Sequence, residues 1–210
     1  MNLLGIESSS RKLSVGLMKE DSFSELHSEK INDTANSLPQ LSKKIINDAS
    51  LSFENLNAIC ISSGPGSFTG LRVGMSYAKG IAMALDIPIV PVSTFDSLAY
   101  KNTSEKLSAL IYSHGNTFYI CKYSLDDGIL LKLSEPKSIL KENVLELSQN
   151  IVFNGPMNIF EDLKAHNLKI EFTDLSVNNI LKIANQNFKL LKTKSLDNLV
   201  PDYVGNFEVK

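Results

Sequence analysis

The chain has 210 residues, of which 43% are hydrophobic and 21% charged, and its net charge is −2 at pH 7. These values are typical of a globular protein with a proper core, and they exclude wholesale disorder and a strongly basic nucleic-acid-binding surface. No apolar run reaches the roughly 18 residues of a membrane helix, and the N-terminus lacks the basic region of a signal peptide. We therefore expect a cytoplasmic protein that does not contact a membrane.

The first half of the chain is predicted to contain strands, followed by alternating helices and strands. Apolar or period-two patterns predict strands at 3–8, 12–19, 22–30, 56–62 and 87–93. Apolar residues at helical spacing predict a helix over 37–49, and a long helix is predicted over 67–85. Pro39 fits the former helix only in its first turn or at a kink.

The second half begins near Lys101 and repeats this plan loosely. Strands are predicted at 107–113, 118–124, 129–135 and 151–155, and helices around 157–164 and 177–191. Asp126–Gly128 has the composition of a hairpin turn between the second and third of these strands. The sequence therefore predicts an α/β protein with two lobes, 1–100 and 101–210.

The stretch ISSGPGSFTGLRVG, at 61–74, is rich in glycine and connects a predicted strand to the long helix. It lacks the lysine of a phosphate-binding P-loop, and Thr69 stands where the third glycine of a dinucleotide fingerprint belongs. A tight turn with Ser67 capping the helix is favoured over nucleotide binding. A weaker nucleotide-binding prediction remains for Glu7, Ser8, Gly64, Gly66 and Ser67.

Within the long helix, Gly70, Gly74, Ala78 and Ala82 recur every four residues. Small residues on such a ridge allow another backbone to approach closely. The neighbour is either a helix of a partner protein or the chain's own sheet or first helix, and the sequence leaves both open. If it is a partner, a leucine at Gly74 or Ala78 should block pairing and leave the fold intact. A second ridge, Ser76–Gly80–Ala84, runs alongside.

Catalytic groupings are missing from the sequence. The three histidines, His27, His114 and His166, are not spaced as metal ligands. Glu7, at the end of the first strand, is the one carboxylate placed like a catalytic acid. No nucleophile, base and oxyanion site come together around it.

Two stretches resemble a known family. LLGIESSSRKLSVGL near the N-terminus and ISSGPGSFTGLRVGMSYAKGIAMALDIPIVPVSTFDSLA, at 61–99, are similar to the TsaB family of bacterial tRNA threonylcarbamoyladenosine biosynthesis proteins, also called YeaZ. VPDYV, at 200–204, resembles the Pro-x-Tyr-Leu ending of that family. The resemblance is clear over the first hundred residues and thin afterwards.

This resemblance implies the fold of actin-like ATPases and sugar kinases, with two lobes of β-meander and alternating helices. It implies a non-catalytic companion in the threonylcarbamoyl (t6A) modification of adenosine 37 in tRNAs that read ANN codons. The expected partners are the catalytic paralogue TsaD, which carries the metal, and the ATPase TsaE, with tRNA reached only through the complex. A homodimer is a further expectation. ATP or ADP at the partner interface stays open, and no cofactor or metal is expected in this chain itself.

The family's pairing through helices of the first lobe, together with the small ridge, predicts a partner-binding face. The residues assigned to it are Leu38, Leu41, Ile45, Gly70, Arg72, Gly74, Met75, Ala78 and Ala82.

The sequence also departs from the family. Residues 92–100 contain no histidine, whereas the catalytic paralogue has an H-x-x-x-H metal-binding pair at the equivalent place. Glu7 replaces the usual aspartate, Asp33 replaces a histidine, and Gly205 stands where arginine is common. Residues 112–119 lack the charged residues usual in the second lobe. Two alternatives stay open: an ATP-dependent small-molecule kinase of the same fold, and a metal-dependent peptidase-like protein.

Overall fold

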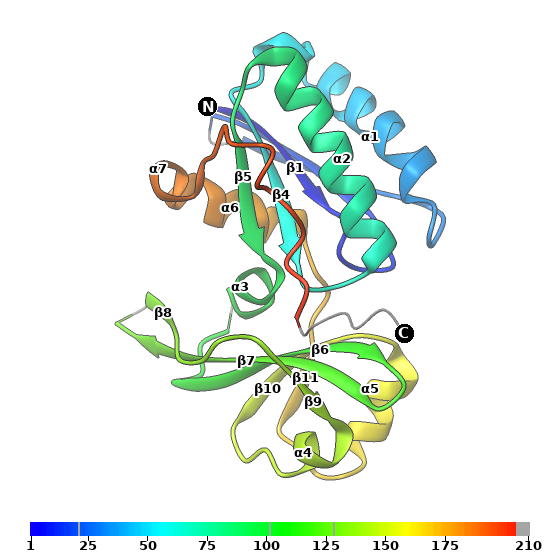
Figure 1. Cartoon of the computed structure of the whole chain (residues 1–210), viewed down its shortest axis with the longest axis vertical. Coiled ribbons are helices and arrows are strands. Elements are labelled where there is room, and N and C mark those ends of the chain that lie inside the picture. The colour runs from blue at the N-terminus through cyan, green and yellow to red at the C-terminus, as the bar shows by residue number, and fades with distance from the viewer. Residues whose placement is uncertain (21, 101, 128, 205–210) are drawn as a thin grey trace. The chain divides into compact units, whose positions relative to one another are not determined.

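A computed structural model describes residues 1–20, 22–100, 102–127 and 129–204. The chain forms two compact units (Figure 1). Unit 1 consists of Met1–Ser97 and Ser176–Asp202, and unit 2 consists of Leu98–Leu175 with Tyr203 and Val204. The first boundary lies close to the expected division at residue 100. However, residues 176–202 return to unit 1 instead of belonging to the second lobe, because helix α6 (Val177–Gln186) packs on the sheet of unit 1.

Unit 1 is built on a five-stranded sheet with the order β3-β2-β1-β4-β5. Its strands are β1 (Asn2–Glu7), β2 (Ser14–Lys19), β3 (Ser22–His27), β4 (Ala58–Gly64) and β5 (Ile89–Ser93). Its helices are α1 (Thr34–Asp48), α2 (Phe68–Leu85), α6 (Val177–Gln186) and α7 (Phe188–Leu191), with a short 3-10 turn at Phe53–Asn55 and with α3 (Thr94–Ala99) at the boundary. The first three strands are antiparallel, and β4 and β5 run parallel to β1.

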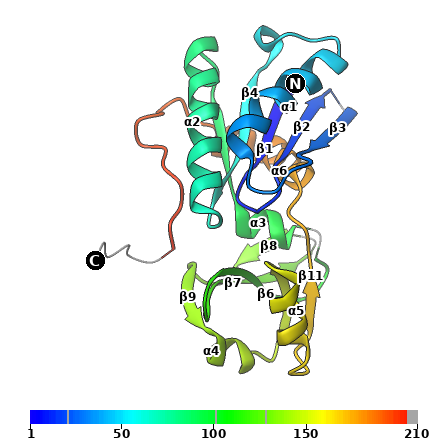
Figure 2. The ribbon, with the colours of Figure 1, turned by 90° about the vertical axis from the view of Figure 1, so that its right-hand side faces the viewer.

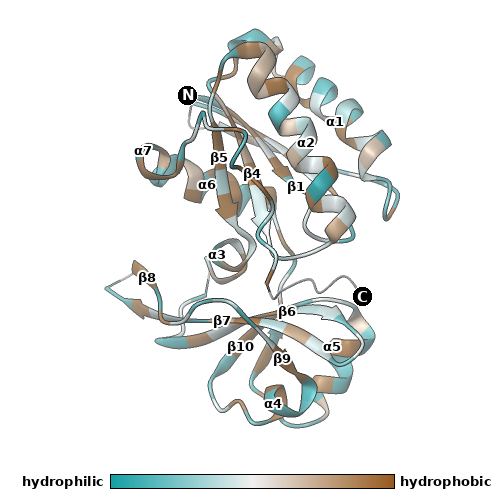
Figure 3. Cartoon of the chain, viewed as in Figure 1, coloured by the Kyte–Doolittle hydropathy of each residue, from teal (hydrophilic) through white to brown (hydrophobic). Residues whose placement is uncertain are grey.

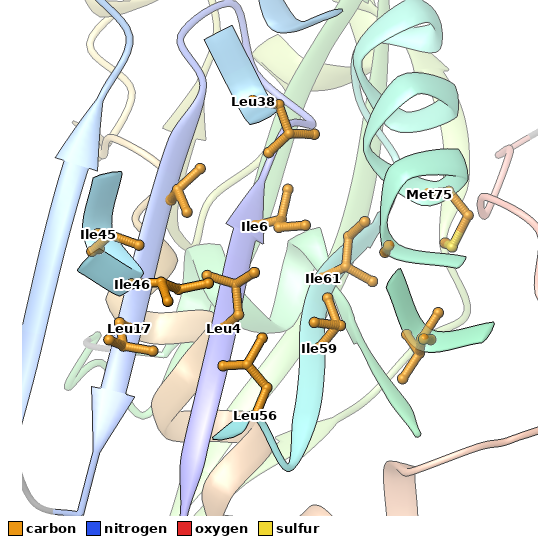
Figure 4. Packing of buried hydrophobic residues seen from close by; sticks show 14 of the residues in the cluster. Leu4, Ile6, Leu17, Leu38, Ile45, Ile46, Leu56, Ile59, Ile61 and Met75 are labelled. Carbon is orange, nitrogen blue, oxygen red and sulfur yellow. The ribbon is translucent and has the colours of Figure 1, made fainter. Parts of the chain in front are cut away.

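Helices α1 and α2 cover one face of this sheet (Figure 2), and their apolar side chains form its core. Leu4 and Ile6 of β1 and Ile61 of β4 point toward these helices and meet Ile46 and Met75 (Figure 4). Helix α6 packs on the other face, where Gly5 and Gly16 lie side by side in register. A Cβ at Gly5 would lie 2.6 Å from Val177 Cγ2, so the absence of a side chain lets α6 approach the sheet.

Unit 2 repeats the topology of unit 1. Its sheet has the order β11-β10-β6-β7-β8, and β9 also pairs with β7. The elements are β6 (Lys106–His114), β7 (Thr117–Asp126), β8 (Ile129–Lys132), β9 (Lys137–Leu140), α4 (Lys141–Leu145), β10 (Asn150–Asn154), α5 (Met157–Lys164) and β11 (Ile170–Phe172). Its core includes a cluster of aromatic rings around Phe153.

This duplication confirms the predicted fold class. In each unit an antiparallel meander is followed by two strands that run parallel to the first strand, with helices between them. This is the plan expected for the actin-like ATPase and sugar kinase fold. Parallel neighbouring strands need a crossover connection, usually a helix, and α2 supplies it between β4 and β5 in unit 1.

The predicted elements are present, with local differences. Helix α1 begins at Thr34 rather than at residue 37, so Pro39 lies inside it, on its exposed side. The predicted helix over 177–191 is interrupted at Asn187, which separates α6 from α7. The short elements β9, α4 and β11 were not predicted. The β7–β8 hairpin is confirmed, while Lys101, Gly128 and Gly205 lie outside the described residues.

Candidate functional site: the start of helix α2

The glycine-rich stretch forms the connection between β4 and α2. Gly64 has φ +117° and Gly66 has φ +159°, values that side-chain-bearing residues rarely adopt. Ser67 is the N-cap of α2, and its Oγ accepts a hydrogen bond from the Gly70 N–H at 3.2 Å. The predicted capping role of Ser67 is therefore confirmed.

The first turns of α2 lie against the segment that follows β1. The Ser67 N–H donates to the Ser9 carbonyl oxygen at 2.6 Å. A Cβ at Gly66 would collide with the Ser9 carbonyl oxygen, and one at Gly70 with the Ser8 carbonyl oxygen. The loop therefore has glycines because two stretches of backbone are in contact here.

Glu7 holds this contact from the sheet side. Its side chain is completely buried, and its Oε1 accepts hydrogen bonds from the Ser9 N–H at 2.7 Å and the Ser9 hydroxyl at 2.5 Å. Burial raises the pKa of Glu7 from 4.5 to about 7, although the hydrogen bonds from Ser9 act in the opposite direction. Glu7 thus fixes the turn at Ser8–Ser10 on which α2 rests.

Asp202 holds the other side of the glycine-rich loop. The Ser63 hydroxyl donates to Asp202 Oδ2 at 2.6 Å, and the Asp202 N–H donates to the Ser63 carbonyl oxygen at 2.7 Å. A Cβ at Gly64 would lie 2.6 Å from the Asp202 carbonyl oxygen. The loop is therefore enclosed by the chain's own backbone on both sides.

The geometry gives Glu7, Ser8, Gly64, Gly66 and Ser67 a structural role, and the weaker nucleotide-binding prediction for them stays a prediction. The N–H of Ser67 at the helix start is already bonded to Ser9, and the space beside three of the glycines is filled by Ser8, Ser9 and Asp202. The residues that resemble a phosphate loop thus fasten α2 to the sheet.

The predicted partner-binding face, which combines residues of α1 and α2, needs correction. Most of its residues face the interior of unit 1, where α2 packs on β4 and on Ser8. The buried members are Leu38, Ile45, Gly70, Gly74, Met75, Ala78 and Ala82. A Cβ at Gly74 would collide with Ser8 Oγ, so a leucine at this position would disturb the fold, contrary to the expectation from sequence. Leu41 is half-buried against the same core, and Arg72 is exposed.

A different ridge of α2 is exposed. It has the same four-residue spacing, and we call it the outer ridge; its residues are Phe68, Arg72, Ser76, Gly80 and Ala84. The Arg72 guanidinium stacks over the Phe68 ring, 3.7 Å from its centroid. Apart from its chain neighbours and the nearby backbone of α2, no described atom lies within 4 Å of a Cβ built at Gly80, and Met83 is 72% exposed. Ser76, Gly80 and Ala84 were recognised in the sequence as a second ridge, whereas Phe68 and Met83 were missed.

The polarity of the two helices differs. Figure 3 shows more hydrophilic colour along α1 than along α2.

Within the described ranges, no three His, Cys, Asp or Glu residues come together in a group that could hold a metal ion. Among the same residues, no helix combines the length and apolar character needed to cross a membrane.

Comparison with known proteins places this chain in a family. The family model described as TsaD, tRNA N6-adenosine threonylcarbamoyltransferase, matches residues 25–199. The chain belongs to this family. It is 28% identical to the tRNA threonylcarbamoyladenosine biosynthesis protein TsaB of Escherichia coli, over 98% of this chain and 95% of that protein. It is also 28% identical to Bacillus subtilis TsaB, over 70% of this chain and 66% of that protein.

The fold agrees with these relatives. The structure of YeaZ from Pseudomonas aeruginosa superposes with a TM-score of 0.80 at 22% identity, covering 96% of this chain and all of that one. The resemblance to TsaB and YeaZ that the sequence motifs indicated is therefore confirmed, and it extends over the second unit, where the motifs were thin.

The corrected role of the buried ridge predicts opposite effects for two glycines of α2. Gly70→Ala places a Cβ against the Ser8 backbone, so it should lower the free energy of unfolding by about 1–3 kcal/mol. Gly80→Ala, in open space on the outer ridge, should raise it by up to about 1 kcal/mol. Urea denaturation measures both. Equal effects at the two positions would contradict the close packing at Gly70.

Burial of Glu7 predicts a stability that decreases with pH. Because the pKa is 4.5 for the free side chain and about 7 in the fold, the folded state binds the proton more tightly. The stability that protonation provides is complete below pH 4.5 and is lost as pH rises through 7. Glu7→Gln keeps an acceptor for Ser9 without a charge, so it should be more stable than the parent at pH 8, by on the order of 3 kcal/mol.

At pH 5 the Glu7→Gln variant and the parent should differ little. Glu29→Gln, which changes an exposed carboxyl of the same unit, is the matched control and should keep the parent's pH dependence. Urea denaturation at pH 5 and pH 8 tests this. A parent whose stability does not fall from pH 5 to pH 8 would contradict the raised pKa of Glu7.

Proposed function

We propose that this chain is a non-catalytic companion subunit in the threonylcarbamoyl (t6A) modification of adenosine 37 in tRNAs that read ANN codons. In this proposal it pairs with the catalytic paralogue TsaD of the same cell and recruits the ATPase TsaE. The tRNA is contacted by the complex and not by this chain alone.

One observation carries the proposal: the chain matches E. coli TsaB over nearly the whole length of both proteins. The relatives that match are named for the biosynthesis of tRNA threonylcarbamoyladenosine. The match to the TsaD model supports the relation to the catalytic paralogue, since it covers most of the chain. The net charge of −2 agrees with a protein that leaves most of the tRNA binding to a partner.

The roles found for the polar residues support a non-catalytic chain. Glu7, the carboxylate placed like a catalytic acid, is buried and hydrogen-bonded to Ser9, where it organises a turn. Thr94–Ala99, at the place where the resemblance puts the paralogue's metal-binding histidines, forms helix α3 and contains no histidine. No observation on the described residues favours a kinase or a peptidase.

The outer ridge is the surface that we assign to TsaD. It lies on α2, in the part of the chain where the family motifs are densest, and Ser76, Gly80 and Ala84 offer small side chains to an approaching helix. Arg72 and Met83 flank them with the kinds of side chain that are enriched at interfaces. We extend the same surface to a homodimer, since a face that meets a paralogue can meet its own copy. ATP or ADP at the interface with TsaD remains a prediction of the resemblance.

The proposal predicts a defined complex. Light scattering of this chain mixed with its own organism's TsaD should show a heterodimer that neither protein forms alone, and t6A formation in vitro should require both. Gly80→Leu introduces a bulky side chain where the helix is open to solvent, so it should weaken pairing by about tenfold or more without loss of stability.

Asn185→Leu is the matched control, because it adds the same side chain to an exposed position of α6 on the opposite face of the sheet. It should pair as the parent does. A parent chain that forms no complex and leaves t6A formation unchanged would refute the proposed function. A complex that tolerates Gly80→Leu would refute only the assignment of the outer ridge.

A further inference from the structure

The last described residues of unit 1 form an irregular segment beside α2. We call residues 193–202 the C-terminal strap; apart from one bridge to β5, they have no regular secondary structure. Figure 2 shows α2 between α1 on one side and this strap on the other. The strap runs from the end of α2 back to its beginning, and it contacts the chain at both places.

At the C-terminal end of α2 the strap joins the edge of the sheet. Thr193 and Ile89 exchange backbone hydrogen bonds, at 2.8 Å from the Thr193 N–H and 2.9 Å from the Ile89 N–H. Ile89 is the first residue of β5, an edge strand whose free side is thereby partly paired. Lys194 Nζ lies 2.9 Å from Oδ1 of Asp86, the C-cap of α2.

Between its ends the strap is anchored by two apolar side chains. Leu196 and Leu199 are half-buried and pack against the hydrophobic core of unit 1, which includes Met75 and Ala82 of α2. The intervening residues, such as Asp197, are exposed. A turn closed by a hydrogen bond from the Leu199 N–H to the Leu196 carbonyl oxygen, at 3.2 Å, lets both side chains pack against the core.

At the N-terminal end of α2 the strap meets the glycine-rich loop through the two hydrogen bonds between Asp202 and Ser63 described above. Gly64 is in close contact with the Asp202 backbone. Glycine is the residue with the greatest freedom in the unfolded and locally opened states. The loop contains Gly64 and Gly66, and α2 contains three more glycines. We therefore expect contacts with the strap to help hold both segments in a single conformation.

We propose that the C-terminal strap is a clamp on α2. It contacts the loop that leads into the helix and the C-cap of the helix, and together with the contact at Ser8 and Ser9 it fixes the position of the outer ridge. The clamp itself is a property of the isolated chain. Its effect on pairing rests on the proposed function, because it requires a partner that binds the outer ridge.

Hydrogen exchange followed by mass spectrometry on the full chain tests the clamp. Asp202→Ala and Ser63→Ala each remove the side-chain hydrogen bond, so amides of residues 63–71 should exchange roughly three- to tenfold faster. Leu199→Ala loosens the middle of the strap and should accelerate exchange at both ends of α2. Asp202→Asn still offers an oxygen to the Ser63 hydroxyl and should restore the parent's exchange. Asp197→Ala, the same substitution at an exposed strap position, is the control and should have no effect.

Pairing with TsaD is then measured for the same variants. Asp202→Ala and Leu199→Ala should bind TsaD about threefold or more weakly, while Asp202→Asn and Asp197→Ala bind as the parent does. Unchanged exchange in Asp202→Ala and Leu199→Ala would overturn the clamp. Faster exchange with unchanged pairing would overturn its link to the outer ridge. A parent chain that does not bind TsaD would refute the proposed function, and the exchange result would still decide whether the clamp exists.

Discussion

The contact between the start of α2 and the turn after β1 is the constraint on which unit 1 depends. The backbones of Ser8 and Ser9 lie where the side chains of residues 66 and 70 would otherwise stand. Glu7 orders this turn by accepting two hydrogen bonds from Ser9. Its carboxyl group is buried as a result, and its pKa rises to about 7. Since α2 is held here so closely, its orientation on the sheet is fixed, and with it the side of the helix that remains exposed.

The sequence predicted the secondary structure of this site, but it did not predict which parts of the chain pack against it. Apolar strands, the Ser67 cap and the need for a close approach along Gly70, Gly74 and Ala78 all follow from local patterns, and all are present. The neighbour of the ridge could not be predicted, because both ridges of α2 contain glycine and alanine and lie roughly 200° apart on the helix. Hydropathy does not show which of two ridges of small residues is buried. The folded chain shows it, because Ser8 lies against Gly70 and Gly74 and not against Gly80.

For the fold as a whole, too, local patterns predict the elements but not the long-range contacts between them. Each unit's meander and alternating elements could be read from periodicity, so the duplicated plan was predicted. The amphipathic pattern of 177–186 indicates a helix that covers a sheet, but it does not say which sheet, and a helix that follows the second unit in the chain returns to the first. The contacts of Asp202 with Ser63 span 139 residues and have no local signal at all. Together, α6 and the C-terminal strap show that unit 1 is completed by the end of the chain.

The central claim, a companion role in t6A formation, is tested most directly in cells. The measurement is the t6A content of tRNAs that read ANN codons, determined by mass spectrometry after depletion of this chain and complementation. The account predicts that t6A falls on depletion, returns with the parent chain and with Asn185→Leu, and does not return with Gly80→Leu. An unchanged t6A content after depletion would contradict it.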